Sequence, residues 1–151
     1  MRYLLILILV FSSISYSKPR GKIIAEIPEA SGIAYCSNSN TLIRANDEGT
    51  YYEMSTDGNI LMKTKLGNYD LEGVVCEDSE LFFAIENKGI LNVQRKRIAK
   101  KKIVLDTKYN GKKLPLFNKK SGVEGIAKNG NVVYLSKQSN KKKKSFIAVV
   151  Q

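Results

Sequence analysis

In three similar stretches of the chain a glycine follows a small or acidic residue, and in two of them that residue is a glutamate. Ser31 precedes Gly32, Glu72 precedes Gly73 and Glu124 precedes Gly125. Further carboxylates, Asp47 and Glu86, follow the first two stretches, and Lys137 takes the matching place after the third. Carboxylates that a fold brings together repel one another, and a bound cation relieves that repulsion best. A site made only of oxygen ligands suits a hard ion such as calcium. The predicted metal ligands are Glu29, Asp47, Asp70, Glu72, Glu86 and Glu124.

A purely structural role is the alternative for these carboxylates. In repeats, Asp and Glu beside Gly often accept hydrogen bonds from backbone amides and so lock adjacent units together. Lys137 aligns with Asp47 and Glu86 and would then serve as an internal counterion. In the functional interpretation, basic and polar side chains near the acids hold an anionic ligand. The predicted ligand-binding residues are Arg44, Asn46 and Lys137.

The composition excludes several kinds of catalytic site. The chain contains no His, which excludes Ser-His-Asp and Cys-His catalysis and His-ligated zinc. Cys36 and Cys76 are too few to hold zinc alone. In an oxidising compartment they can pair across neighbouring repeats, and buried free thiols are the alternative that the sequence leaves open. Catalytic residues are not assigned; an enzymatic version would be metal-assisted hydrolysis of a phosphate or carboxylic ester, with a carboxylate as general base.

The elements that must position these residues are predicted to be β-strands. Alternating runs bounded by turn residues dominate the sequence, and helical periodicity is hard to find. A repeat of about 40 residues is typical of a stacked β-unit such as a propeller blade. The repeats cover about residues 29–68, 70–106 and 122–151. We therefore predict an all-β, propeller-like fold of three antiparallel four-stranded blades, with an inserted loop at 107–121.

The number of predicted strands does not decide how a propeller ring would close. A strand is predicted at 22–27, ahead of the first repeat, whereas the third repeat lacks a fourth strand. Closed propellers typically have four to eight blades. Two copies of the chain would make a six-bladed homodimer if each N-terminal strand completed the partner's third blade. The alternatives are a fragment of a longer propeller and an open stack of three sheets, whose exposed edges favour aggregation.

The start of the chain is predicted to be a signal peptide. Arg2 is followed by an apolar run at 4–11 and by small residues at 15 and 17. Cleavage after Ser17 would leave a propeller-like domain at 18–151. An uncleaved membrane anchor is the alternative, but the apolar run is far shorter than the roughly 20 residues that span a bilayer. The sequence therefore predicts a periplasmic or secreted protein.

The chain is strongly basic, with a formal net charge of +11. Basic runs lie at 95–97, 100–102 and 141–144. One interpretation is a solvated fringe of lysines that keeps β-edges apart. The other is attraction to an anionic envelope polymer or a membrane surface. Nucleic acid is not a predicted partner, because it does not fit a signal peptide and no aromatic residues interleave the basic runs to stack on bases.

Four phrases of the sequence resemble those of the SdiA-regulated family, part of a wider group of phytase-like β-propellers of bacterial envelopes. They are Glu29-Ala-Ser-Gly-Ile-Ala34, Asn46-Asp-Glu-Gly49, Asp70-Leu-Glu-Gly73 and Gly122-Val-Glu-Gly-Ile-Ala127. The resemblance covers about 29–150 and implies a six-bladed propeller, an exported location and an axial acidic site that holds calcium. For the function we expect an exported module of undefined biochemical activity that binds a ligand or partner. The alternative is a calcium-dependent esterase or phosphoesterase active only as an assembled ring. The chain has about half of the length expected for the family.

Overall fold

The computed structural model describes residues 21–96, 99–103, 108–109, 112–113, 122–138 and 145–150, and all regular structure in these ranges is β. The first sheet has the order β1 (Ala30–Cys36), β2 (Thr41–Asn46), β3 (Thr50–Ser55), β4 (Ile60–Lys65). The second has the order β5 (Leu71–Glu77), β6 (Glu80–Ile85), β7 (Gly89–Gln94), β8 (Ala99–Ile103). The third has the order β11 (Val123–Asn129), β12 (Val132–Lys137), β13 (Phe146–Val150). Across the described ranges, no helix is long and apolar enough to cross a bilayer.

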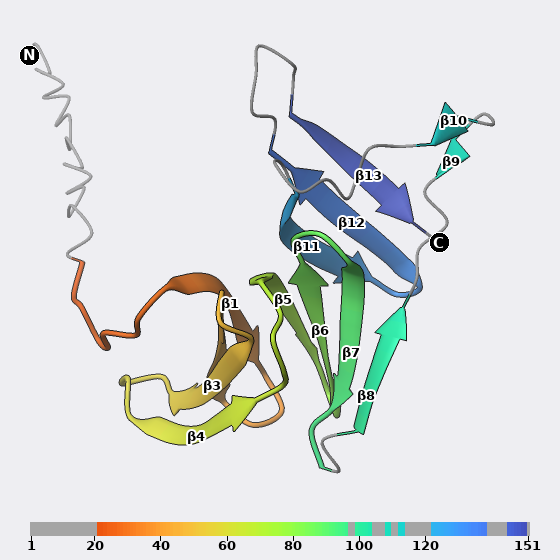
Figure 1. Cartoon of the computed structure of the whole chain (residues 1–151). Helices are drawn as coiled ribbons and strands as arrows, with labels where there is room; N and C mark the ends of the chain where they lie inside the picture. The colour runs from red at the N-terminus through yellow and green to blue at the C-terminus, as the bar shows by residue number, and fades with distance from the viewer. Residues whose placement is uncertain are drawn as a thin grey trace, which may run out of the picture.

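The sheets form an arc of three blades, with β5–β8 between β1–β4 and β11–β13 (Figure 1). Within each blade every ladder is antiparallel, and the first strands of successive blades pack against one another. Glycine permits this close approach: a Cβ on Gly32 would lie 2.8 Å from the carbonyl O of Glu72, and a Cβ on Gly73 would lie 3.0 Å from the amide N of Ile126. The predicted all-β, propeller-like fold is confirmed. We call the three sheets blade one, blade two and blade three.

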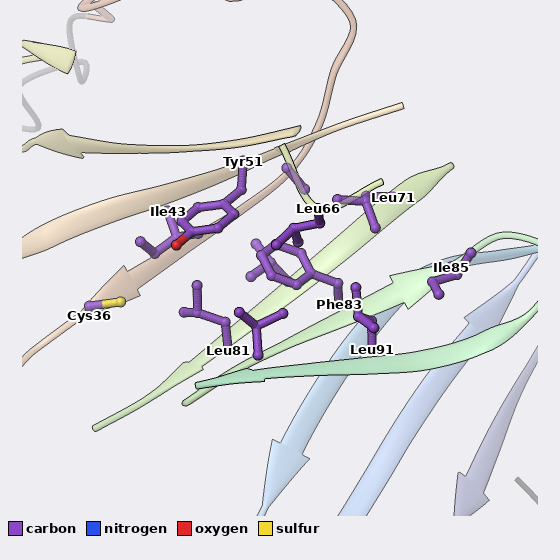
Figure 2. Close-up of a cluster of buried hydrophobic side chains, with 12 residues drawn as sticks. Cys36, Ile43, Tyr51, Leu66, Leu71, Leu81, Phe83, Ile85 and Leu91 are labelled. Carbon is purple, nitrogen blue, oxygen red and sulfur yellow. The ribbon is translucent and has the colours of Figure 1, made fainter. Parts of the chain in front are cut away.

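Two apolar cores fill the spaces between neighbouring blades. Figure 2 shows the larger core, between blades one and two, where the rings of Tyr51 and Phe83 lie 5.6 Å apart. The smaller core joins Phe82 and Ala84 of blade two to Val123 and Leu135 of blade three. Alternation along β6 thus sends Phe83 toward one neighbour and Phe82 toward the other.

A disulfide links blades one and two. Cys36 ends β1, Cys76 lies near the end of β5, and their Cα atoms are 5.4 Å apart. Cys36 is buried beside the larger core. The structure therefore decides between the two states that the sequence left open.

The structure corrects the predicted strand at 22–27. Residues 21–27 have no regular secondary structure and belong to no sheet. A strand needs a ladder partner, and the edge that would suit this one belongs to β13, at the far end of the arc (Figure 1). The segment lies instead on blade one, where the carbonyl of Ile24 packs directly against Gly58. Blade three therefore has three strands within the described residues rather than the predicted four.

The predicted insertion at 107–121 contains a short hairpin. It consists of β9 (Lys108–Tyr109) and β10 (Lys112–Lys113). The rest of that insertion, and the predicted signal peptide, lie outside the described residues.

Candidate functional site

A β-bulge recurs at the start of the first strand of every blade. The pairing register shifts between Ala30 and Ile33 in β1, between Leu71 and Gly73 in β5, and between Val123 and Gly125 in β11. A bulge adds one residue to its strand and re-aims a side chain. Glu72 and Glu124 are the extra residues in blades two and three.

In blade one the corresponding bulge holds Ser31 in place of a glutamate. Its hydroxyl donates a hydrogen bond to the carbonyl of Leu71, so it ties blade one to blade two. The repeated bulge therefore supplies a carboxylate in two blades and a link between blades in the other.

A second set of carboxylates follows the second strands. Asp47 comes directly after β2 and Glu86 directly after β6. The amide of Asp47 donates to the carbonyl of Glu29 at 3.4 Å, and the amide of Glu86 donates to the carbonyl of Asp70 at 3.0 Å. These bonds hold the end of each second strand beside the start of the first, so the carboxylates of neighbouring blades gather at one end of the first strands.

Three of the predicted metal ligands form one compact group. Asp47, Asp70 and Glu72 each offer a carboxylate oxygen, and these oxygens all lie within 4.8 Å of one another. Calcium binds oxygen at 2.3–2.6 Å, so two ligands of one ion can lie about 5 Å apart. The donor set is all oxygen and carries enough charge for a divalent ion. These residues, which we call the acidic trio, therefore fit calcium.

Burial and mutual repulsion raise the pKa values of several carboxylates in and around the acidic trio. Burial, followed by the charges of Glu124, Asp47 and Asp70, raises the pKa of Glu72 to about 8. Burial also raises the pKa of Glu124, with Asp70 and Asp47 adding to the effect. The pKa of Glu86 is raised mainly by burial and then by its hydrogen bond with Asp70. A cation bound among these carboxylates would remove most of this repulsion.

Lys137 supplies a positive charge on the side of blade three. The residue is buried at the end of β12, and burial lowers its pKa, while Glu124 and Glu86 act in the opposite direction. Its ammonium therefore faces two of the predicted ligands that lie outside the acidic trio. The counterion role and the cation site are compatible, because they use different carboxylates.

Three predicted site residues, Glu29, Asn46 and Arg44, either form hydrogen bonds with the backbone or lie away from the acidic trio. Glu29 adopts a left-handed φ of 46°, is exposed, and contributes its carbonyl to the amide of Asp47. Asn46 is buried, and its side-chain oxygen accepts from the amides of Glu48 and Thr50 at 3.1 and 3.2 Å, which shapes the β2–β3 turn. Arg44 lines a groove on the open face of blade one. The group gathered here is thus smaller than the predicted set.

A cavity adjoins the acidic trio and contains residues that the sequence did not indicate. It has a volume of about 630 Å³ and includes Asp47 and Asp70 in its lining. Lys65, Tyr69 and Lys88 line it as well, and the Lys88 ammonium lies 5.7 Å from the centre of the Tyr69 ring. Lys65 ends β4, whereas Tyr69 and Lys88 stand in connecting segments, and none of the three is marked by a matching residue in the other repeats. The only available signal was the position of Lys88 soon after a predicted ligand.

The basic runs are partly used within the fold. Arg95 forms an ion pair with Glu53 of blade one and donates to the hydroxyl of Ser39 at 3.1 Å. Lys100 donates to the carbonyl of Leu66 at 2.7 Å. The run at 141–144 lies outside the described residues. The first two runs therefore contribute to contacts between blades one and two.

Comparison with known proteins places the chain in a sequence family. A family model described as SdiA-regulated matches residues 13–144. No curated protein matches the chain.

Three solved structures share a low sequence identity with the chain. The computationally designed Ika4 protein is 10% identical with a TM-score of 0.49, over 87% of this chain and 100% of that one. The computationally designed Ika8 protein is 12% identical with a TM-score of 0.47, over 75% of this chain and 33% of that one. The β-propeller domain of Myceliophteria thermophila Cps50 (Swd1) is 16% identical with a TM-score of 0.45, over 74% of this chain and 35% of that one. The chain spans about a third of the length of the last two.

Proposed function

The chain belongs to the SdiA-regulated family and has a propeller-like fold. From this we propose that it is an exported module. We propose further that it binds an anionic ligand or partner, together with calcium, at its axial acidic site. The observation that carries this proposal is the acidic trio, whose carboxylate oxygens lie within 4.8 Å of one another. Calcium would supply a positive centre that these carboxylates hold in place and that an anionic group of the ligand can approach.

The cavity beside the trio supports an anionic ligand. Asp47 and Asp70 belong both to the trio and to the cavity lining, so a cation held there would border the cavity. Lys65 and Lys88 lie on the same lining. Ammonium groups attract phosphate or carboxylate as point charges. The pairing of acids for the ion and lysines for the ligand favours recognition of a phosphate or carboxylate group.

The disulfide supports export. Disulfides persist in oxidising compartments such as the bacterial periplasm and are rare in reducing ones. Cys36 and Cys76 are joined in the structure. Together with the basic start and apolar run of residues 1–17, this supports a periplasmic or secreted location.

Calcium titration of thermal stability tests the proposal. An ion that binds only the native state stabilises it, by about 2.7 kcal/mol at 100 times Kd. We expect calcium to raise the melting temperature of the protein and chelator to reverse the change. Asp70→Asn should abolish the response, because it removes one trio ligand and a carboxylate of the cavity. Asp57→Asn, in the exposed β3–β4 turn, is the matched control and should keep it. An equal response in wild type and Asp70→Asn would overturn the site.

A calcium-dependent esterase or phosphoesterase is the second candidate. It is favoured by the juxtaposition of a carboxylate that can accept a proton, Asp70, with Lys88, which can hold an anionic substrate in the same cavity. Calcium would neutralise charge on the substrate oxygen. The test is turnover of p-nitrophenyl phosphate and p-nitrophenyl acetate by calcium-loaded protein. Turnover that chelator and Asp70→Asn both abolish would establish the enzyme, and silence from calcium-loaded protein would exclude it for these substrates.

A further inference from the structure

Both ends of the three-blade arc present apolar side chains to solvent. On blade one, Ile33 and Tyr35 are 54% and 55% exposed. On blade three, Ile147 and Val149 are 71% and 59% exposed. Tyr134 lies directly opposite Val149 in the ladder and is also exposed, so these side chains share one face. Contiguous exposed apolar faces mark interaction sites.

The interfaces inside the arc show what such faces do in this fold. Leu135 and Ala148 form a neighbouring pair on the opposite face of blade three, toward blade two, and both are buried. In blade one, Ile43 on the face toward blade two is fully buried. The two end faces therefore carry the same kind of apolar surface that is covered wherever a neighbouring blade is present.

The repeated glycine contact points to the same conclusion. Gly32 packs on the first strand of blade two, and Gly73 packs on the first strand of blade three. Gly125 repeats this position in blade three. Within the described residues, the atoms nearest to a Cβ placed there belong to Ser136 of the same blade, at 2.7 and 3.9 Å. Blade three thus presents a glycine at the place where each preceding blade receives its neighbour.

Among the described strands, blade three has an open sheet edge at β13, and residues 21–27 are a segment that pairs with none of them. Within the described chain, β13 pairs only with β12, so its outer edge is open. Residues 21–27 have no regular secondary structure and join no sheet. They lie on the open face of blade one, beside a groove of about 690 Å³ that Ile24, Ile33 and Met54 help to line. A segment that is in no sheet can take up an extended conformation and add to an open sheet edge through main-chain hydrogen bonds.

We propose that two copies of this chain close head to tail into one six-bladed ring. The exposed face of blade three of each copy packs on blade one of the other, and residues 22–27 of each copy add to β13 of its partner as a fourth strand. Closed propellers have four to eight blades, so two arcs of three blades fit and three arcs do not. Closure covers both apolar end faces and pairs the open edge of β13. This inference does not depend on the calcium site.

The test begins with the solution mass of the exported form, measured by light scattering after chromatography. We expect twice the monomer mass, with calcium and with chelator alike. Ile147→Lys and Ile33→Lys should each give monomers, with association weakened by roughly 100-fold or more, because each places a charge in both interfaces of the ring. Both side chains are exposed in the single arc, so circular dichroism should show unchanged folding. Val149→Lys replaces Ile147→Lys if that variant does not fold. Ala99→Lys, on the exposed outer strand of blade two, is the control and should remain a dimer.

Mixing the two monomeric variants distinguishes the ring from other dimers. In the mixed pair, blade one of the Ile147→Lys chain and blade three of the Ile33→Lys chain are both intact. One interface is therefore restored, and a heterodimer should form in a mixture of the two but in neither alone. A monomeric wild type, a dimer that survives Ile147→Lys, or variants that do not complement each other would each overturn the ring. A dimer whose melting temperature does not respond to calcium would leave the ring standing and remove the proposed cation site.

Discussion

Removal of the Cys36–Cys76 disulfide should cost this protein a large part of its stability. The bond closes a loop with a sequence separation of 40 residues. The chain-entropy relation gives about 4 kcal/mol for a loop of this length, since the unfolded chain regains the freedom that the bond withheld. Small domains have a total stability of about 5–15 kcal/mol. The expected fall in melting temperature is on the order of 15 °C.

Guanidinium unfolding at a fixed protein concentration measures this cost. The same protein is unfolded in its oxidised form and after reduction, and the free energies of unfolding are compared. Cys36→Ala with Cys76→Ala is the control: it should match the reduced protein and should not respond to reductant. Cys36 is buried against the larger core, so the double variant also loses a small amount of packing.

A loss below about 1 kcal/mol would refute the reasoning. It would mean that the unfolded chain is already restricted, or that the oxidised native state gains nothing from the link between β1 and β5. A double variant that still loses stability in reductant would show that the effect does not come from this bond.

Three further changes have outcomes that the geometry fixes. Burial and the neighbouring carboxylates raise the pKa of Glu72 to about 8. Without metal, the free energy of unfolding is therefore highest below the unfolded pKa of about 4.5 and falls as the pH rises through about 8, because ionised Glu72 destabilises the native state. In urea unfolding with chelator, Glu72→Gln should be more stable than wild type by a difference that begins above about pH 4.5 and is complete above about pH 8; equal pH profiles would contradict this. In calcium the order should reverse, because the ion binds the ionised carboxylate. Gly32→Ala should destabilise the protein by about 1–3 kcal/mol, because the new Cβ would lie 2.8 Å from a backbone carbonyl of blade two. Gly21→Ala, with open space around it, is the control and should change little. Equal urea midpoints for the two variants would refute the close contact. Arg95→Met should cost about 3 kcal/mol, since it removes the cation beside the largely buried carboxylate of Glu53, to which the Thr41 hydroxyl still donates; a cycle with Glu53→Gln should recover part of that loss.

The blade pattern was readable from the sequence because it depends on local features. Alternating strands and a glycine at one place in each repeat were enough to predict stacked antiparallel blades, and the structure adds that the first strands pack closely at those glycines. The same alignment matched Glu72 with Glu124 and Asp47 with Glu86, and the structure brings all four to one end of the first strands. Backbone position was therefore predictable wherever the repeats agree.

Side-chain direction was less predictable, because it depends on bulges and turns. Asn46 follows the repeat pattern, but its amide oxygen accepts two backbone amides of its own turn. Arg44 alternates onto the open face of blade one. The pairing of the cysteines was undecided because they are one residue out of register with the glycines. Only the actual stagger of β1 against β5 determines which side chains meet.

The lysines beside the acidic trio were missed for a related reason. Lys65 ends β4 and Lys88 lies in the β6–β7 turn, so no internal copy of the repeat marks them. The predicted strand at 22–27 failed for a different reason: strand propensity cannot form a ladder when the suitable edge lies at the other end of the arc.

The disulfide and the acidic trio lie at opposite ends of the same pair of strands. Cys36 and Cys76 stand at the closing ends of β1 and β5, whereas Asp70 and Glu72 stand at the opening of β5. Blades one and two are thus joined by a covalent bond at one end of these strands and, in the proposed site, by a bound cation at the other, with the larger apolar core between them. In that proposal the two ends respond to different conditions: a reductant acts on the strand ends that carry the cysteines, and a chelator acts on the strand openings that carry the acidic trio.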